Sequence, residues 1–257
     1  MPATPAWPPK SAPRLFVDRA IAAGARVTID GSQAHYLAKV MRVTSGAAVM
    51  LCDDLTGEWA CTVAEVGKRA VVLEPVERLR PREAVPDFWL CPALLKKDRF
   101  DLVLEKASEL GVAEIRPLVT RRCVADKLNA ERAKAIVTEA AEQCARTALP
   151  TLAEPVKLEA LLRDWPQDRT LFFADELGGE PAAAAFVGIT SAALLTGPEG
   201  GFDEAERTTI GALPQARAIS LGPRILRGET AAIAATALWM GLAGDWNNSL
   251  ARGEPVS

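Results

Sequence analysis

The last third of the chain carries Leu195-Thr196-Gly197-Pro198-Glu199-Gly200-Gly201-Phe202-Asp203, followed by Ser220-Leu221-Gly222-Pro223-Arg224-Ile225-Leu226-Arg227-Gly228-Glu229-Thr230. Each of these glycine-bearing loops follows a short apolar run and leads into a helical pattern. Strand, glycine loop and helix in succession is a common way for an α/β sheet to hold a ligand. Two such loops close together in the chain predict one shared pocket.

The region around these loops alternates between strand and helix patterns from Pro86 onward. Strands are predicted at 88–94, 115–119, 170–174, 192–196 and 216–221, and helices at 99–110, from the cap Asn129 to just before Pro150, at 203–213 and at 230–243. Segment 151–167 receives no assignment. Continuous apolar strands between helices predict a mainly parallel sheet that is covered on both faces.

The first part of the chain has a different, β-rich pattern. Strands are predicted at 14–17, 26–29, 47–52, 58–66 and 70–76, with one helix that Asp30 caps and that places Ala34, Leu37, Ala38 and Met41 on its apolar side. We expect a small barrel over residues 14–80, a polar linker after it, and the α/β domain over residues 86–244. The polar tail from Gly244 is expected to fray.

Composition excludes several classes of protein. The chain has 257 residues, 49% of them hydrophobic, and a formal net charge of −3. Its 5 cysteines are widely spaced and it has 1 histidine, so we expect no metal site, no disulfide framework and no histidine-dependent triad. Residues 1–14 lack the apolar core of a signal peptide, and 231–243 is too short to span a membrane. We therefore predict a cytoplasmic protein without a membrane segment.

The first loop is neither a Walker loop nor a G-x-G-x-x-G motif. Its glycines allow backbone groups to approach a ligand closely, and Asp203 with Glu206 forms a capping-box pattern for the next helix. Glu199 disfavours a phosphate and suits a cationic ligand or a ribose hydroxyl. The competing interpretation is a tight strand-to-helix turn without a ligand.

The second loop and the residues after it concentrate charged and hydroxyl side chains. Arg227 is a natural partner for an anion or a carbonyl, and Thr230 is a candidate cap for the last helix. The competing interpretation is an Arg–Glu surface pair plus a helix cap.

Together the two loops closely resemble the RsmE family, SPOUT-class methyltransferases that modify N3 of a uridine in small-subunit ribosomal RNA. Further similar segments are Lys106-Ala107-Ser108-Glu109-Leu110-Gly111-Val112, Arg121-Arg122-Cys123, Ala141-Glu142-Gln143-Cys144-Ala145-Arg146 and His35-Tyr36-Leu37-Ala38-Lys39-Val40-Met41-Arg42. The resemblance covers roughly residues 14–244.

The resemblance implies a PUA-like β-barrel followed by a SPOUT α/β domain with a C-terminal trefoil knot, an exception to the rule that chains are unknotted. The knot would wrap S-adenosylmethionine. Cofactor-binding candidates are Thr196, Gly197, Glu199, Gly200, Gly201, Leu221, Gly222, Ile225, Leu226 and Thr230. The family is usually a homodimer, and the alanine-rich helix at 231–243 offers a packing face.

Methylation at N3 of uridine requires loss of the N3 proton, so a base or a stabilising cation would help. Arg227 and Glu229 are the catalytic candidates: Arg227 could stabilise the anion or position a base, and Glu229 could orient Arg227 or act as the base. Glu199 is a third possibility, and no metal is required.

The implied partner is small-subunit ribosomal RNA or the 30S subunit, and basic residues lean toward the first half of the chain. Candidate RNA contacts are His35, Lys39, Arg42, Lys96, Lys97, Arg99, Arg121 and Arg122. Competing functions are a non-catalytic RNA-binding or assembly factor, a SPOUT ribose 2′-O-methyltransferase, and a different nucleotide-dependent α/β enzyme.

Overall fold

The computed structural model describes residues 7–9 and 11–248. Part of the proline-rich start and part of the tail that was expected to fray lie outside these residues. The chain divides into two compact units. Among the described residues, the first unit contains the chain up to Ala84 and the segment Ala141–Ala148, and the second contains Val85–Ala140 and residues 149–248.

The described part of the first unit is built on a five-stranded sheet of order β1-β3-β4-β5-β2. The strands are β1 (Arg14–Phe16), β2 (Val27–Ile29), β3 (Ala48–Cys52), β4 (Glu58–Val66) and β5 (Val71–Arg80). β1 runs parallel to β3, and the other neighbouring pairs are antiparallel. Alternate side chains such as Val49, Leu51 and Val63 are buried in one apolar core.

The predicted helix after Asp30 is present but divides into α1 (Gly31–His35) and a wider π-helical turn, η1 (Tyr36–Val40). Asp30 stands at the N-cap, yet within the described chain its side chain makes no capping hydrogen bond, so that detail of the prediction is wrong. Leu37 is buried as expected, whereas Met41 is exposed. A π-turn holds more residues than an α-turn and so rotates later positions around the axis.

A buried carboxylate joins the strands of the first unit. Glu58 on β4 pairs with Arg14 at 2.7 Å and with Arg80 at 2.8 Å. The two arginines also donate to the carbonyls of Glu142 and Ala145, within the segment that belongs to this unit. Burial by itself would raise the pKa of Glu58, but the hydrogen bonds and charges of the two arginines hold it below its ordinary value.

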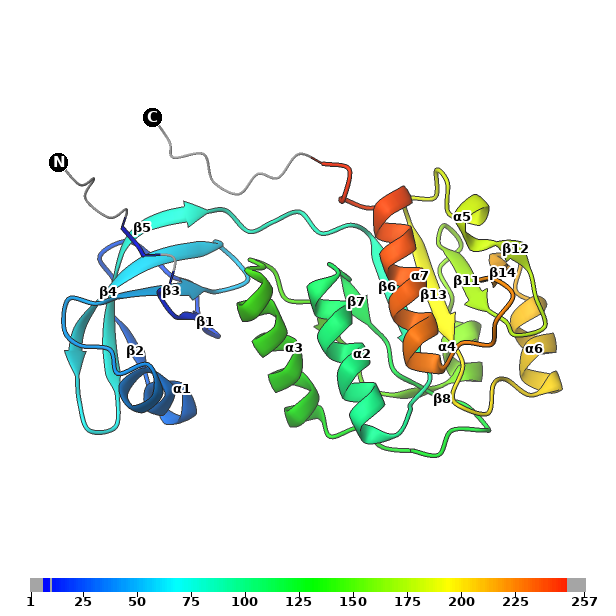
Figure 1. The fold of residues 1–257 in the computed structure, drawn as a ribbon, viewed down its shortest axis with the longest axis horizontal. Helices are drawn as coiled ribbons and strands as arrows, with labels where there is room; N and C mark the ends of the chain where they lie inside the picture. The colour runs from blue at the N-terminus through cyan, green and yellow to red at the C-terminus, as the bar shows by residue number, and fades with distance from the viewer. Residues whose placement is uncertain (1–6, 10, 249–257) are drawn as a thin grey trace. The chain divides into compact units, whose positions relative to one another are not determined.

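The described part of the second unit contains a sheet of seven parallel strands in the order β12-β14-β11-β13-β6-β7-β9 (Figure 1). Its strands are β6 (Phe88–Pro92), β7 (Glu114–Ile115), β9 (Thr151–Leu152), β11 (Thr170–Ala174), β12 (Glu180–Pro181), β13 (Ala192–Thr196) and β14 (Ala216–Ser220). The predicted parallel sheet is therefore confirmed. β8 (Leu118–Val119) and β10 (Val156–Lys157) form a separate parallel pair.

Helices cover both faces of this sheet, also as predicted. One apolar cluster joins the sheet to α2 (Lys97–Glu109), α3 (Ala130–Cys144), α5 (Ala182–Ala185) and α7 (Gly228–Leu242), and the other joins it to α4 (Leu158–Arg163) and α6 (Glu204–Gly211). Neighbouring residues of β13 divide between them: Leu194 lies in the first cluster and Leu195 in the second. This alternation follows from the two-residue period of a strand.

Several local predictions can be checked residue by residue. Asn129 accepts a hydrogen bond from the Arg132 amide at 2.9 Å, which confirms it as the cap of α3. The single strand expected at 115–119 is wrong: β7 and β8 are separate, with Pro117, which has no N–H for a ladder, between them. The unassigned segment 151–167 contains β9, β10 and α4.

Candidate functional site

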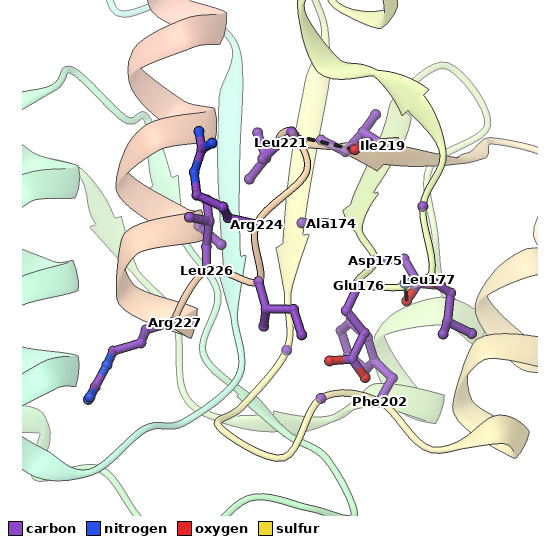
Figure 2. A pocket seen from close by; sticks show the side chains of 18 of the residues that line it. Ala174, Asp175, Glu176, Leu177, Phe202, Ile219, Leu221, Arg224, Leu226 and Arg227 are labelled. Carbon is purple, nitrogen blue, oxygen red and sulfur yellow. Dashed lines mark hydrogen bonds between the residues drawn. The ribbon is translucent and has the colours of Figure 1, made fainter.

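Three loops meet at one edge of the second unit's sheet. They follow β11, β13 and β14, which are adjacent and parallel, so their carboxyl ends lie together. The loops enclose a cavity of about 510 Å³ (Figure 2). Its lining includes Asp175, Glu176, Leu177 and Gly178 from the first loop, Gly197, Pro198, Glu199, Gly201 and Phe202 from the second, and Leu221, Gly222, Pro223, Arg224, Ile225, Leu226 and Arg227 from the third. The predicted shared pocket is present.

The loop after β13 approaches the cavity with its backbone. Gly201 has φ +65°, and a side chain there would lie 3.0 Å from an oxygen of Glu176. Asp203 and Glu206 form the predicted capping box at the start of α6, so the end of this loop is anchored. The amide of Asp203 donates to Glu206 at 3.0 Å, and the amide of Glu206 donates to Asp203 at 2.7 Å.

The loop after β14 supplies an apolar wall. Ile225 is 83% exposed and lines the cavity. Leu221 and Leu226 line the same cavity, and Gly222 has φ +107°, a conformation open mainly to glycine.

The loop after β11 carries cavity residues that were not predicted from the sequence. Arg207 of α6 pairs with Asp175 at 3.0 Å and with Glu176 at 2.9 Å. Burial would lower the pKa of Arg207, but these carboxylates hold it above its ordinary value, so its charge is fixed. The only available sequence signal was that Asp175 directly follows a correctly predicted strand, because the position of β11 between β13 and β14 appears only in the structure.

Predicted RNA contacts Arg121 and Arg122 instead hold the loop after β13. Arg122 donates to the carbonyl of Gly200 at 2.8 Å, and Arg121 pairs with Asp203 at 3.2 Å. The amide of Arg121 also donates to Glu206 at 2.7 Å. Both side chains are largely exposed, so these contacts leave room for an RNA contact as well.

Glu199, the third catalytic possibility, lines the cavity and accepts a hydrogen bond from the amide of Lys96 at 3.2 Å. That amide stands at the N-terminus of α2, so Glu199 connects the loop to the start of this helix. The side chains of Lys96 and Lys97 are exposed.

The two predicted catalytic residues have different environments. Arg227 lines the cavity and is exposed; in Figure 2 its side chain extends away from Glu176 and Phe202. Glu229 is buried and lies 3.8 Å from Arg99 of α2, so it pairs with Arg99 and not with Arg227. Its Oε2 has no hydrogen-bond partner in the described chain.

The predicted cofactor residues divide into two groups. Those that line the cavity are Gly197, Glu199, Gly201, Leu221, Gly222, Ile225 and Leu226. Thr196, Gly200 and Thr230 are not among the described residues that line the cavity. Thr196 is buried in β13, and Gly200 packs on Arg122. Thr230 is not the cap of α7 either: the helix begins at Gly228 with Arg227 at its N-cap.

The remaining RNA candidates His35, Lys39 and Arg42 lie in the first unit, exposed on or just after α1 and η1. Over residues 7–9 and 11–248, no cluster of three or more His, Cys, Asp or Glu side chains could hold a metal ion. In the same residues no helix combines the length and apolarity needed to cross a membrane.

A parallel sheet whose carboxyl-end loops enclose a ligand-sized pocket defines the class of cofactor-binding α/β proteins. Residues 82–240 match the RNA methyltransferase domain, and residues 29–76 match the RNA methyltransferase PUA domain. The first match spans more than half of the chain. The chain therefore belongs to the RNA methyltransferase family, and the resemblance inferred from its motifs is confirmed.

Individual relatives agree with this assignment. The ribosomal RNA small subunit methyltransferase E of Synechocystis is 31% identical over 222 residues, which cover 83% of this chain and 72% of the relative. The protein of the same name from Rickettsia conorii is 27% identical, and the match covers 87% of this chain and 93% of the relative. A crystal structure of the Neisseria gonorrhoeae namesake bound to S-adenosyl methionine has a TM-score of 0.83 at 25% identity, covering 91% of this chain and 99% of that one.

Proposed function

We propose that this protein transfers a methyl group from S-adenosylmethionine to N3 of a uridine in small-subunit ribosomal RNA. The observation that carries the proposal is the three-loop pocket in a chain of the RNA methyltransferase family. The relatives described above are named ribosomal RNA small subunit methyltransferase E, and the Neisseria gonorrhoeae protein binds S-adenosyl methionine. The choice of N3 rests on the resemblance of both loops to the RsmE family.

The residues of the pocket suit this cofactor. Leu221, Ile225 and Leu226 offer an apolar surface for an adenine ring, and the glycine-containing loops expose backbone groups that can bind polar atoms. The carboxylates of Glu176 and Glu199 suit a ligand with a positive charge. S-Adenosylmethionine, when bound, would supply a methyl group activated by a sulfonium.

We propose that the chain forms a trefoil knot at this pocket. β14 lies on the far side of β11 from β13, yet α7, which follows β14, packs on β13, β6 and α2. The chain must therefore cross back over the loops of neighbouring strands. The start of α7 is tightly placed, because a Cβ on Gly228 would lie 2.8 Å from the carbonyl oxygen of Gly197.

We assign RNA binding to the PUA-like domain at residues 14–80 and methyl transfer to the domain at residues 86–244. The exposed cations His35, Lys39 and Arg42 of the first domain are proposed phosphate contacts, as are Lys96 and Lys97 of the second. Arg227, exposed at the wall of the pocket, is available to an RNA phosphate. Small-subunit ribosomal RNA would be met in the cytoplasm, either free or within the 30S subunit.

We also propose a homodimer that forms through α7. Its outer surface carries exposed Ala234 and Leu242 and partly exposed Ala237 and Leu238. Small and apolar side chains of this kind let two helices approach closely.

The experiment is methyl transfer from labelled S-adenosylmethionine to small ribosomal subunits taken from a strain that lacks this protein, followed by nucleoside analysis. The wild type is expected to form 3-methyluridine. Gly201→Ala, which places a side chain at φ +65° beside Glu176, should lose about tenfold in cofactor affinity. Gly211→Ala on α6 meets open space and is the matched control.

Other outcomes would contradict the proposal in distinct ways. Label on a ribose would assign the protein to another branch of its class. Cofactor binding without methyl transfer to subunits or to free ribosomal RNA would favour a non-catalytic role in RNA binding.

A further inference from the structure

The arginines that line the cavity are, among the described residues, Arg99, Arg207, Arg224 and Arg227. Only some of them can serve a reacting base. Arg207 is neutralised by Asp175 and Glu176. Arg224 and Arg227 are exposed, and Figure 2 shows both directed away from Glu176 and Phe202.

Arg99 differs from the other three. Its side chain is about one third exposed, at 32%, and its guanidinium lies 3.8 Å from the carboxylate of Glu229. At that distance the two groups attract each other without a hydrogen bond, so within the described chain the N–H groups of Arg99 stay available to a ligand. Arg99 thus lines the cavity while its guanidinium lies beside the carboxylate of Glu229.

Glu229 itself cannot reach a ligand in this arrangement. It is 9% exposed and does not contribute to the cavity wall formed by the described residues. Its Oε2 is buried without a partner. A buried carboxylate oxygen without a hydrogen-bond partner is costly to keep, and such exceptions call for an explanation. The ion pair with Arg99 explains why this carboxylate is buried here.

We propose that Arg99 is the catalytic cation that stabilises the uracil anion, and that Glu229 is a positioning residue that holds Arg99 toward the cavity. The inference rests on the proposed function and deepens it by naming the residues that meet the base. It also changes two sequence-based predictions, since Arg99 was expected to contact phosphate and Glu229 to serve Arg227 or act as the base.

The reaction balances with water as proton acceptor. The uracil ring loses its N3 proton to solvent, leaving a negative charge shared between N3 and the flanking carbonyl oxygens. N3 then forms a bond to the methyl carbon, while the electrons of the broken S–C bond remain on sulfur. Arg99 donates hydrogen bonds to the charged ring and, because a guanidinium keeps its proton, it stabilises the anion without acting as an acid.

The first test is the pH profile of single-turnover methylation for wild type, Arg99→Ala and Arg99→Lys. Loss of one preorganised charge-stabilising group should slow Arg99→Ala about a hundredfold near neutral pH. The deficit should shrink as the pH rises, because the uracil then ionises without help. Arg99→Lys keeps the charge and should recover part of the rate. The matched control is Arg132→Ala on α3, which removes an ion pair to Asp101 of α2, the helix that carries Arg99.

The second test separates Glu229 from the reacting base. Glu229→Gln keeps the shape and removes the charge, and it should slow the wild type but add little to the defect of Arg99→Ala. Equal slowing in both backgrounds would show that Glu229 acts independently and would overturn its positioning role. If Glu229→Gln does not fold, the pH profile of Arg99→Ala decides the part that concerns Arg99.

Calorimetry of S-adenosylmethionine binding completes the design. The affinity of Arg99→Ala should stay within about twofold of wild type. An affinity loss as large as the rate loss, or parallel pH profiles, would overturn the inference while wild type still forms 3-methyluridine. Absence of 3-methyluridine from wild type would instead contradict the proposed function itself.

Discussion

At the scale of single residues, the cavity depends on places where no side chain fits. A Cβ on Gly228 would lie 2.8 Å from the carbonyl oxygen of Gly197 and 3.0 Å from Cδ2 of Leu95. A backbone carbonyl cannot move aside as a flexible side chain can. Gly228 therefore lets the loop after β14 and the start of α7 close onto the loop after β13. This contact joins the two glycine-bearing motifs, which are separate in the sequence.

Glu58 gives a residue-scale prediction about pH and stability. Its pKa is below the ordinary value in the folded state, so the stability it contributes is complete above the unfolded-state pKa of about 4.3 and is lost as the pH falls through the folded-state pKa. Glu58→Gln leaves two partly buried arginines without their partner and should cost about 3 kcal/mol at pH 7 in urea denaturation.

The matched control is Glu74→Gln, which removes the exposed pair with Arg26 and should cost under about 1 kcal/mol. The difference between Glu58→Gln and wild type should narrow toward pH 3. A cost that does not change with pH would assign the effect to packing and not to charge.

At the scale of elements, α6 acts as an anchor for the loop after β13. Both carboxylate oxygens of Glu206 accept hydrogen bonds from backbone amides. One amide is that of Asp203, at the end of the loop, and the other is that of Arg121, in the segment after β8. The helix thus connects two stretches that are far apart in the sequence. The loop can present its backbone to a ligand because the hydrogen bonds of Glu206 hold its end.

Glu206→Ala is the prediction at this scale. It leaves two amides without their acceptor, so it should cost about 1–2 kcal/mol in the free energy of unfolding and weaken S-adenosylmethionine binding. Glu204→Ala, an exposed acidic residue in the same first turn, should change stability by less than about 0.5 kcal/mol. Thermal unfolding and calorimetry measure the two effects. Equal behaviour of the two variants would contradict the anchoring role.

At the scale of the whole molecule, the described chain consists of two units with separate apolar cores. The first also takes in Ala141–Ala148, which include the last residues of α3, and their carbonyls receive hydrogen bonds from Arg14 and Arg80. A segment from the middle of the chain thus completes the first unit. The domain boundaries predicted from the sequence, 14–80 and 86–244, leave this segment out of the first domain.

The homodimer is tested at this scale. Ala234→Arg places a long charged side chain on the outer surface of α7 and should convert a dimer to a monomer in light scattering, with an unchanged circular dichroism spectrum. Ala135→Arg, on an exposed position of α3, is the control and should remain dimeric. A wild type that is monomeric at micromolar concentration would contradict the proposed dimer.

Local pattern was sufficient for most of the second unit. The strands at 170–174 and 192–196 were predicted with the bounds that the structure has, and the capping box of α6 and the cap at Asn129 were confirmed. These features depend on interactions between residues close in the chain, or on the apolar period of a single element. The two glycine loops likewise predicted a pocket and a family, because glycines at these positions allow the backbone to approach a ligand closely.

Partners that meet only through the fold could not be inferred in the same way. The pairing of Glu229 with Arg99, 130 positions earlier, depends on how α7 packs on α2. The loop at Asp175 joined the pocket because β11 lies between β13 and β14, an order that no local pattern encodes. Local chemistry thus determined the elements and the motifs, whereas the strand order decided which side chains share the cavity, because contacts between distant residues follow from packing.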